Sequence, residues 1–269
     1  MATEIHPSAI VDSGAQLGEN VKIGPFCIIE GNTVIGDDCT LGANVQIKSF
    51  TRMGKGNTLD SGVVLGGLPQ HLGFKGEETW VVLGDNNILR EYVTIHRATG
   101  VDIGRESTIV GNNCMIMAYA HVAHDCTLGD HVIIANAANI AGHVDVGNYV
   151  TIGGMAGLHQ FVRIGDYAFV GAMSGFGQDI PPYMIATGVR GVLQGPNSIG
   201  LRRNGFKAKT CNSIKKAYRL IFRSETPRKE ALDQAEQEFA DVPEVQNLIE
   251  FIRSSKRGVT SAGHGSKEI

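Results

Sequence analysis

A small aliphatic residue recurs at every sixth position along most of the chain, and glycine often follows it. One run comprises Val11, Leu17, Ile23, Ile29, Ile35, Leu41, Ile47, Met53, Leu59 and Leu65. A second run, in step with itself, comprises Ile116, Val122, Leu128, Ile134, Ile140, Val146, Ile152, Leu158, Ile164 and Val170. A period of six fits neither a helix nor an isolated strand, and it is typical of a parallel β-helix built from hexapeptide turns. We therefore predict a mainly β chain with these side chains in a narrow core and glycine at tight corners.

The same repeat predicts how residues stack. If three hexapeptides close one triangular coil, residues 18 apart lie one above the other at the strand spacing of about 4.8 Å. Leu65 and Leu83 differ by 18, so we expect residues 66–82 to leave the coils as a loop. The register then slips by one near residues 103–110. Loops that project from a solenoid often carry its function.

The hydrophobic period becomes helical in the last third of the chain. An apolar stripe indicates a helix around residues 209–224, and it consists of Ile214, Ala217, Leu220 and Ile221. Pro227, after the expected N-cap Thr226, and Pro243 are expected to begin two further helices. We therefore expect a hexapeptide β-helix over residues 1–190, a helical subdomain over 191–258 and a disordered tail over 259–269.

Composition narrows the class of protein. The chain has 269 residues, a net charge of −3 and five cysteines without CxxC spacing. This pattern indicates neither a disulfide framework nor a zinc site, so we expect a reducing, cytoplasmic setting. The first residues read as a rung of the repeat, and we expect no signal peptide and no membrane span.

Histidines gather in the second run of repeats. The 18-residue coil places His124, Gly142 and Gln160 in one column and Asp125, His143 and Phe161 in the next. Asn139 stands above His121, and His159 precedes Gln160. Three coils thus bring together more histidines than a solvated surface is expected to carry, which predicts a functional site.

Two chemistries compete for this cluster. Three histidines could hold zinc, as in hexapeptide carbonic anhydrases, but those proteins draw spaced histidines from neighbouring subunits, unlike HVAHD. The alternative is a histidine general base oriented by a carboxylate, with the N–H of Gly142 available to an oxyanion. A GxSxG nucleophile motif is absent from the sequence, which favours direct transfer over a covalent acyl-enzyme. We expect no metal.

Several motifs resemble one family over nearly the whole chain. HVAHDC, AGHV, GGMAGLHQF, QDIPPY and RSETP are similar to those of the UDP-N-acetylglucosamine 3-O-acyltransferases, a hexapeptide-repeat family. The resemblance implies a left-handed parallel β-helix with a C-terminal α-helical subdomain, assembled as a homotrimer with active sites between subunits. It implies transfer of a 3-hydroxyacyl group from acyl carrier protein to the 3-hydroxyl of UDP-N-acetylglucosamine, the first step of lipid A biosynthesis. The donor's phosphopantetheine arm carries the acyl group, and no cofactor is expected.

The resemblance also implies residue roles. His124 corresponds to the general base, Asp125 to its orienting partner and Gly142 to the oxyanion donor. The residues expected to contact substrate or the pantetheine arm are Gln70, His121, His143, His159 and Gln160, with Asn197 and Arg203 for the nucleotide. Ala172 corresponds to a residue that measures acyl-chain length. The chain departs from the family at four places, with His71, Gly73, Ile199 and Asn204 where an Asp, a Lys, a Glu and an Arg are usual.

Partners and alternatives complete these expectations. Basic residues crowd the first long C-terminal helix of an acidic protein, and we expect them to dock acidic acyl carrier protein; they are Lys207, Lys209, Lys215, Lys216, Arg219 and Arg223. Aromatic residues are not interleaved with this charge, so we do not expect nucleic acid. The alternatives are a 3-amino acceptor sugar, a coenzyme A-dependent sugar O-acetyltransferase and a non-enzymatic scaffold, although HxxHD argues against a scaffold.

Overall fold

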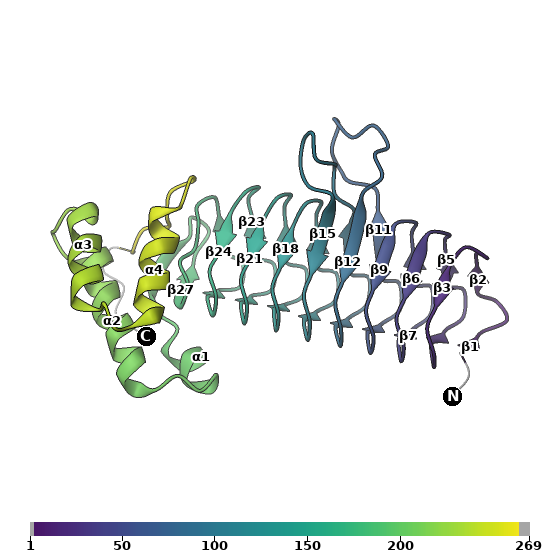
Figure 1. Ribbon diagram of the computed structural model, residues 1–269, viewed down its shortest axis with the longest axis horizontal. Coiled ribbons are helices and arrows are strands. Elements are labelled where there is room, and N and C mark those ends of the chain that lie inside the picture. Colours follow the sequence, from purple (N-terminus) through teal and green to yellow (C-terminus); the bar gives the residue numbers. More distant parts are fainter. Residues whose placement is uncertain (1–2, 264–269) are drawn as a thin grey trace.

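The computed structural model describes residues 3–263, and most of them form a left-handed parallel β-helix. Within this range the strands stack into three sheets that make the sides of a long prism (Figure 1), and all pairs are parallel except the last pair of the first sheet, which is antiparallel. Residues 18 apart pair in the ladders, as in Ile29 with Ile47 and Val122 with Ile140. The predicted hexapeptide architecture is therefore confirmed.

Each sheet takes one strand from each coil. The first sheet contains β1 (Glu4–Ile5), β4 (Lys22–Ile23), β7 (Thr40–Leu41), β10 (Thr58–Leu59), β13 (Ile88–Leu89), β16 (Met115–Ile116), β19 (Ile133–Ile134), β22 (Thr151–Ile152), β25 (Phe169–Val170), β27 (Met184–Thr187) and β28 (Val192–Pro196). The second sheet contains β2 (Ile10–Val11), β5 (Ile28–Ile29), β8 (Gln46–Ile47), β11 (Val64–Gly67), β14 (Thr94–His96), β17 (His121–Val122), β20 (Asn139–Ile140), β23 (Gly157–Leu158) and β26 (Gly175–Phe176). The third sheet contains β3 (Gln16–Leu17), β6 (Thr33–Ile35), β9 (Thr51–Met53), β12 (Trp80–Leu83), β15 (Ser107–Val110), β18 (Thr127–Leu128), β21 (Asp145–Val146) and β24 (Arg163–Ile164).

The predicted aliphatic positions form the core of the prism. Every residue of the second run, from Ile116 to Val170, is buried, and so are those of the first run from Ile23 onward. Val11 and Leu17 are only partly buried, because they lie in the first coil, which is covered on one side alone. Burial of these side chains, at about 25 cal/mol per Å² of apolar surface, is the main force that holds the coils together.

Glycine serves a purpose that differs from the predicted one. The left-handed backbone at the corners is adopted by non-glycine residues, including Asp125 and His143, each with φ of 62°. The glycine after the aliphatic residue is instead needed where neighbouring coils approach closely. A Cβ at Gly24, for example, would lie 2.7 Å from the carbonyl oxygen of Gly42 in the next coil. At most positions the six-residue glycine pattern therefore reflects the stacking distance between coils, although Gly66, with φ of 81°, also adopts the left-handed backbone.

Two loops leave the coils, and both project from the same edge of the prism (Figure 1). The first runs from residue 68 to 79, between β11 and β12, which is narrower than the expected 66–82 because both ends are paired in strands. The second runs from residue 97 to 106, between β14 and β15. The sequence pattern indicated this second loop only as a slip in register. Thr94 consequently pairs with His121, a separation longer than one 18-residue coil.

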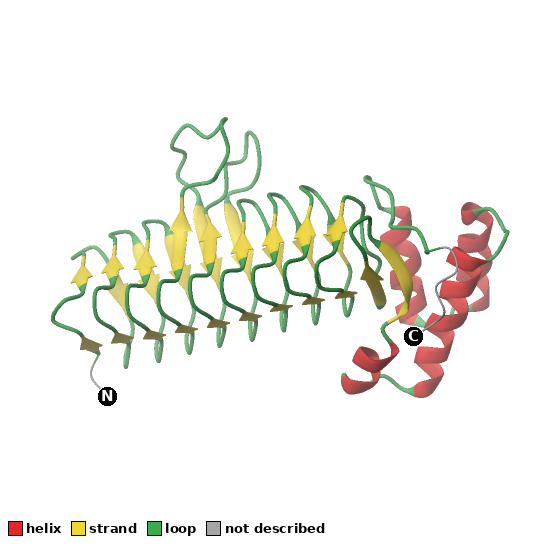
Figure 2. Cartoon of the chain, turned by 180° about the vertical axis from the view of Figure 1, so that it is seen from behind, coloured by secondary structure: helices red, strands yellow, loops and turns green. Residues whose placement is uncertain are grey.

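Among the described residues, four helices lie at the C-terminal end of the prism (Figure 2). They are α1 (Ser198–Arg203), α2 (Ala208–Arg223), α3 (Arg228–Glu238) and α4 (Pro243–Arg253). Helix α2 buries Ile214, Ala217 and Ile221 as predicted, together with Tyr218, whereas Leu220 is only partly buried. Helix α3 begins one residue later than predicted: Pro227 occupies the cap position and Thr226 does not cap the helix.

The segment after α4 was expected to be a disordered tail, but its first part packs on the prism. Val259 bridges to Asp179 and Ala262 bridges to Leu193. The side chains of Val259 and Thr260 are buried. The short strand β28 also extends the first sheet beyond the expected domain boundary at residue 190. The remainder of the expected tail, residues 264–269, lies outside the described residues.

The length and apolar character of the helices bear on membrane insertion. Between residues 3 and 263, none of them combines the length and the apolar character that crossing a bilayer requires.

Candidate active site

A pocket of about 1070 Å³ opens beside the second sheet, near the base of the first loop. The pocket is lined by Gly142 and by five other residues that the sequence predicts to be functional: Gln70, His121, His124, His159 and Gln160. Apolar side chains such as Leu158 and Phe176 and the glycines Gly157 and Gly175 extend it along the coils. The stacked repeat therefore brings the predicted site residues together from three successive coils and one loop.

Main-chain contacts fix the predicted columns. His121 pairs with Asn139 in the parallel ladder. The N–H of His143 donates to the carbonyl of His124 at 3.0 Å, and the N–H of Phe161 donates to that of Gly142 at 3.2 Å. Because these bonds belong to the coil geometry, the relative positions of the side chains follow from the fold.

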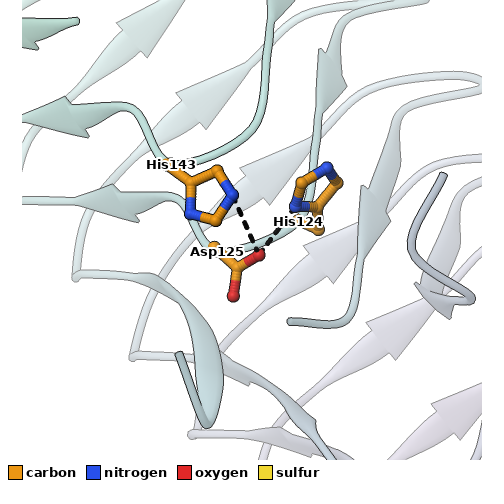
Figure 3. Close-up of side chains that lie close together, drawn as sticks. All are labelled: His124, Asp125 and His143. Carbon is orange, nitrogen blue, oxygen red and sulfur yellow. Dashed lines mark hydrogen bonds and ion pairs between the residues drawn. The ribbon is translucent and has the colours of Figure 1, made fainter. Parts of the chain in front are cut away.

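His124 and Asp125 form a buried pair, drawn in Figure 3. Nδ1 of His124 lies 2.7 Å from Oδ2 of Asp125. Burial alone would raise the pKa of Asp125, but hydrogen bonds from His124, Thr99 and Arg105 outweigh it and hold this pKa at about 2. The carboxylate is therefore ionised and can only accept, so Nδ1 of His124 carries a proton, and in the neutral imidazole Nε2 is the nitrogen with the lone pair.

The second loop supplies donors to Asp125 that the sequence analysis missed. The N–H and Oγ1 of Thr99 donate to the carboxylate at 3.1 and 2.8 Å, and the N–H of Arg105 donates at 2.7 Å. The N–H of Asp125 itself donates to Oγ1 of Thr108 at 2.8 Å. The register slip near residues 103–110 was the available signal, but a slip alone does not indicate which residue faces Asp125.

His143 approaches the same oxygen of Asp125 as His124 does (Figure 3). Its Nε2 is 3.7 Å from Oδ2 of Asp125, and its ring stacks on Phe161 with centroids 4.4 Å apart. Burial is the main cause that lowers the pKa of His143, although Asp125 opposes it. His143 does not line the pocket, so in a single chain it contacts the catalytic pair and not the open space.

His124, Asp125 and His143 are candidate ligands for a metal ion. Ligand atoms of His124, Asp125 and His143 all lie within 4.8 Å of one another. A carboxylate has about four lone-pair sites, and the carboxylate of Asp125 already accepts four hydrogen bonds from His124, Thr99 and Arg105. The donor set is therefore better suited to orienting an imidazole than to coordinating a cation.

Gly142 packs directly against the ring of His124. A Cβ at this position would lie 2.7 Å from Nε2 of His124, so any side chain here would displace the imidazole. Among residues 3–263, no hydrogen-bond partner is found for the N–H of Gly142. This glycine thus leaves an unpaired main-chain donor beside the free nitrogen of the histidine.

Two further imidazoles surround the pair. The ring of His71, in the first loop, meets that of His124 edge to face with centroids 5.4 Å apart, and its Nδ1 accepts from the N–H of Gly73 at 3.1 Å. His96, which the sequence analysis missed, meets His121 at 4.8 Å. Nδ1 of His121 also lies 2.7 Å from Oγ1 of Thr94.

Burial sets the charge of these outer histidines. Desolvation, with the nearby His121 and His124, lowers the pKa of His96 to about 4. Desolvation and His124 also lower the pKa of His121. The lowered pKa values favour the neutral form of His96 and His121.

Besides Asp125 and His143, three further predicted residues do not line this pocket within one chain. Asn197 caps α1, where its Oδ1 accepts from the N–H of Gly200 at 3.1 Å. Arg203 is exposed in the last turn of the same helix. Ala172 is exposed at the corner between the first and second sheets, in the predicted column with Gly154. Their roles in substrate binding and chain length stay predictions.

The helix α1 also carries two of the departures from the family pattern. Ile199 is exposed, and Asn204 ends the helix, with its Nδ2 donating to the carbonyl of Gly200 at 2.9 Å. The basic residues of the next segment are mostly solvent-facing, among them Lys207, Lys209 and Lys216.

Comparisons with known proteins agree along the chain. Residues 179–260 match the family described as Udp N-acetylglucosamine O-acyltransferase, domain 2. Residues 32–67 and 107–142 match the bacterial transferase hexapeptide family. The chain is 58% identical over 256 residues to the acyl-[acyl-carrier-protein]–UDP-N-acetylglucosamine O-acyltransferase of Aquifex aeolicus, covering 95% of this chain and 97% of that protein. It is 57% identical to the protein of the same name from a Sulfurihydrogenibium species, covering 95% and 94%.

Solved structures give the same result. The UDP-N-acetylglucosamine acyltransferase of Bacteroides fragilis superposes with a TM-score of 0.92 at 42% identity, over 95% of this chain and 99% of that one. The UDP-N-acetylglucosamine O-acyltransferase of Moraxella catarrhalis superposes with a TM-score of 0.91 at 40% identity, over the same shares of the two chains.

Proposed function

The chain belongs to the acyl-[acyl-carrier-protein]–UDP-N-acetylglucosamine O-acyltransferase family, and we propose that the His124 pocket is where it performs this reaction. The enzyme moves an acyl group from acyl carrier protein to UDP-N-acetylglucosamine, the first step of lipid A biosynthesis. Within that activity, the proposed group is a 3-hydroxyacyl chain and the proposed acceptor is the sugar 3-hydroxyl. The observation that carries the proposal is the buried His124–Asp125 pair, with Nε2 of His124 free beside the unpaired N–H of Gly142.

His124 acts as the general base. Its Nε2 takes the proton from the sugar 3-hydroxyl while that oxygen attacks the carbonyl carbon of the thioester. The oxyanion of the tetrahedral intermediate accepts a hydrogen bond from the N–H of Gly142. When the intermediate collapses, the carbon–sulfur bond breaks and the proton passes from His124 to the departing sulfur. The products are the sugar ester and the free thiol of the phosphopantetheine arm.

Asp125 stabilises the imidazolium that forms during this step. It holds the Nδ1 proton of His124 and stays ionised throughout, as its low pKa requires. The reaction as written needs neither a metal nor another cofactor, because a hydroxyl attacks an activated thioester directly. The saturated carboxylate of Asp125 supports this view.

The remaining pocket residues are assigned to substrate. Gln70 on the first loop contacts the sugar, and His121, His159 and Gln160 contact the sugar or the pantetheine arm. His143 is assigned to holding the His124–Asp125 pair in place, since its ring lies close to Asp125 and stacks on Phe161. The apolar floor formed by Leu158 and Phe176 suits the less polar part of the donor.

A homotrimer would complete the site. Asn197 and Arg203 are assigned to the nucleotide, yet they do not line the pocket of their own chain. An exposed apolar ridge along one corner of the prism supports association, and it consists of Tyr92, Tyr119, Met155 and Met173. A threefold assembly through such a face brings residues of neighbouring chains together.

The donor partner is acyl carrier protein, as in the family name. We assign its docking to the basic residues at and after the start of α2, where Lys207, Lys209 and Lys216 face solvent. A positive surface steers an acidic partner mainly by raising the association rate. The five free cysteines, four of them buried, support the expected cytoplasmic location.

A substrate matrix tests the proposal. The purified full chain is incubated with 3-hydroxyacyl thioesters of acyl carrier protein or coenzyme A, and with UDP-N-acetylglucosamine or its 3-amino analogue, and products are identified by mass. We expect an O-acylated sugar, formed fastest with the carrier-protein donor. Equal or faster transfer from coenzyme A would favour the acetyltransferase alternative, and an amide product alone would favour the 3-amino acceptor.

A further inference from the structure

The second loop, residues 97–106, lies directly over the carboxylate of Asp125. Gly104 lies against this carboxylate: a Cβ there would lie 2.5 Å from Oδ1 of Asp125 and would also collide with Oγ1 of Thr99. The φ of Gly104 is outside the left-handed region, so its backbone does not require glycine. Glycine is needed here for the contact alone. The loop therefore packs against the carboxylate, and its position decides how the carboxylate is held.

Internal hydrogen bonds give the loop a fixed shape. The N–H of Gly100 donates to the carbonyl of Arg105 at 2.9 Å, and the N–H of Gly104 donates to the carbonyl of Gly100 at 2.7 Å. Its larger apolar side chains, Val101 and Ile103, are exposed and do not anchor it to the prism. Residues 97–99, at the start of the loop, are buried. Residues 101–106 are attached by polar contacts.

The side chain of Arg105 provides that attachment. Its guanidinium donates to both carboxylate oxygens of Asp145, on β21, at 2.7 and 3.0 Å. It also donates to Oγ1 of Thr127, on β18, at 2.6 Å. A two-pronged contact of this kind fixes orientation as well as distance. The same residue donates its main-chain N–H to Asp125 at 2.7 Å.

We propose that Arg105 is a positioning residue for acyl transfer, and that its ion pair with Asp145 holds the second loop in register with the catalytic pair. The chain of contacts runs from Asp145 to the Arg105 side chain, from the Arg105 N–H to Asp125, and from Asp125 to His124. This inference rests on the proposed function of His124 and goes beyond it. Loss of the Arg105 side chain frees the loop and weakens one of the bonds that orient Asp125.

Stability alone does not account for this ion pair. The side chains of Arg105 and Asp145 are 36% and 43% exposed, and exposed pairs contribute little to the stability of a fold. The chain contains a matched pair elsewhere: Arg253 on α4 contacts Asp233 and Glu236 on α3 at 2.7 and 2.8 Å, with similar exposure. That pair touches no residue of the pocket and serves as a control.

Steady-state kinetics of the full chain with carrier-protein donor and UDP-N-acetylglucosamine test the proposal. We expect Arg105→Ala to lower kcat about tenfold. Loss of a residue that orients a functional group typically costs about 10–100-fold, and this value is the lower end of that range. KM should change less than twofold and the melting temperature should stay near that of the wild type. Arg105→Lys, which keeps one charged contact, should recover part of kcat, and Arg253→Ala should retain all of it.

Two further variants make the outcome unambiguous. Asp145→Asn removes the charge that Arg105 binds while keeping the size of the side chain, so it should lower kcat like Arg105→Ala and carries the test if that variant does not fold. Wild-type kcat in both Arg105→Ala and Asp145→Asn, with His124→Ala inactive in the same assay, would overturn the positioning role and leave the proposed function standing. An inactive wild type would instead contradict the proposed function.

Discussion

Nδ1 of His124 lies 2.7 Å from Oδ2 of Asp125, although the two residues are neighbours in the chain. Adjacent side chains of a strand point to opposite faces of a sheet. The contact is possible because the chain turns a corner at Asp125, whose φ of 62° places its backbone in the left-handed region. One corner of one coil therefore supplies both members of the pair.

Replacing the carboxylate of Asp125 by an amide separates its catalytic role from substrate binding. Asp125→Asn replaces an acceptor oxygen with an NH₂ group that faces donors of Thr99, Arg105 or His124. We expect kcat to fall by about 10²-fold or more, since the imidazole loses its counter-charge and its tautomer. KM for both substrates should stay within about twofold. A change confined to KM would identify Asp125 as a sugar ligand.

Ala172 is predicted to limit the length of the acyl chain. Removing its methyl group in Ala172→Gly should shift the preference toward longer 3-hydroxyacyl chains, and Ala172→Met should shift it toward shorter ones. One methylene in an apolar pocket discriminates by roughly 1–3 kcal/mol. Competition among carrier-protein thioesters of graded length measures the profile. Identical profiles for the three proteins would exclude Ala172 as the ruler.

His96 is predicted to make the fold sensitive to moderate acid. Its pKa is lowered to about 4 from the ordinary 6.5, mainly by burial. Between these two pH values the unfolded chain binds a proton that the folded chain does not, so stability falls as the pH drops through this window. His96→Asn should remove part of that loss. Urea unfolding at pH 7 and pH 5 measures it, with the exposed His6→Asn as control. The same pH dependence in all three proteins would contradict the prediction.

The coils could be predicted because one short rule repeats. Each inward position must hold an aliphatic side chain, so the pattern from Ile116 to Val170 specifies both the core and the stacking of residues 18 apart. That stacking predicts, from the sequence alone, that His124 lies beneath Gly142 and Asp125 beneath His143. The glycine that often follows the aliphatic residue is predicted to permit a corner, and this prediction is wrong at most positions, because close contact between coils requires the glycine there.

The loops could not be predicted in the same way, because they follow no period. The hydrogen bonds that Thr99 and Arg105 donate to Asp125 depend on how residues 97–106 fold back over a neighbouring coil. The packing of Val259 and Thr260 was missed for a related reason. A short polar segment rich in glycine resembles a solvated tail, and only the surface that it meets determines its order.

The central claim is that His124 removes the proton from the attacking hydroxyl, and turnover of His124→Ala tests it most directly. Initial rates of acyl-sugar formation at saturating carrier-protein donor and UDP-N-acetylglucosamine are compared for the wild type and the variant. Circular dichroism and size-exclusion chromatography check that fold and assembly are kept. The account predicts a loss of about 10²–10⁴-fold, typical of a missing general base. A variant that keeps more than about a tenth of the wild-type rate would contradict it, because water and the neighbouring neutral histidines would then suffice.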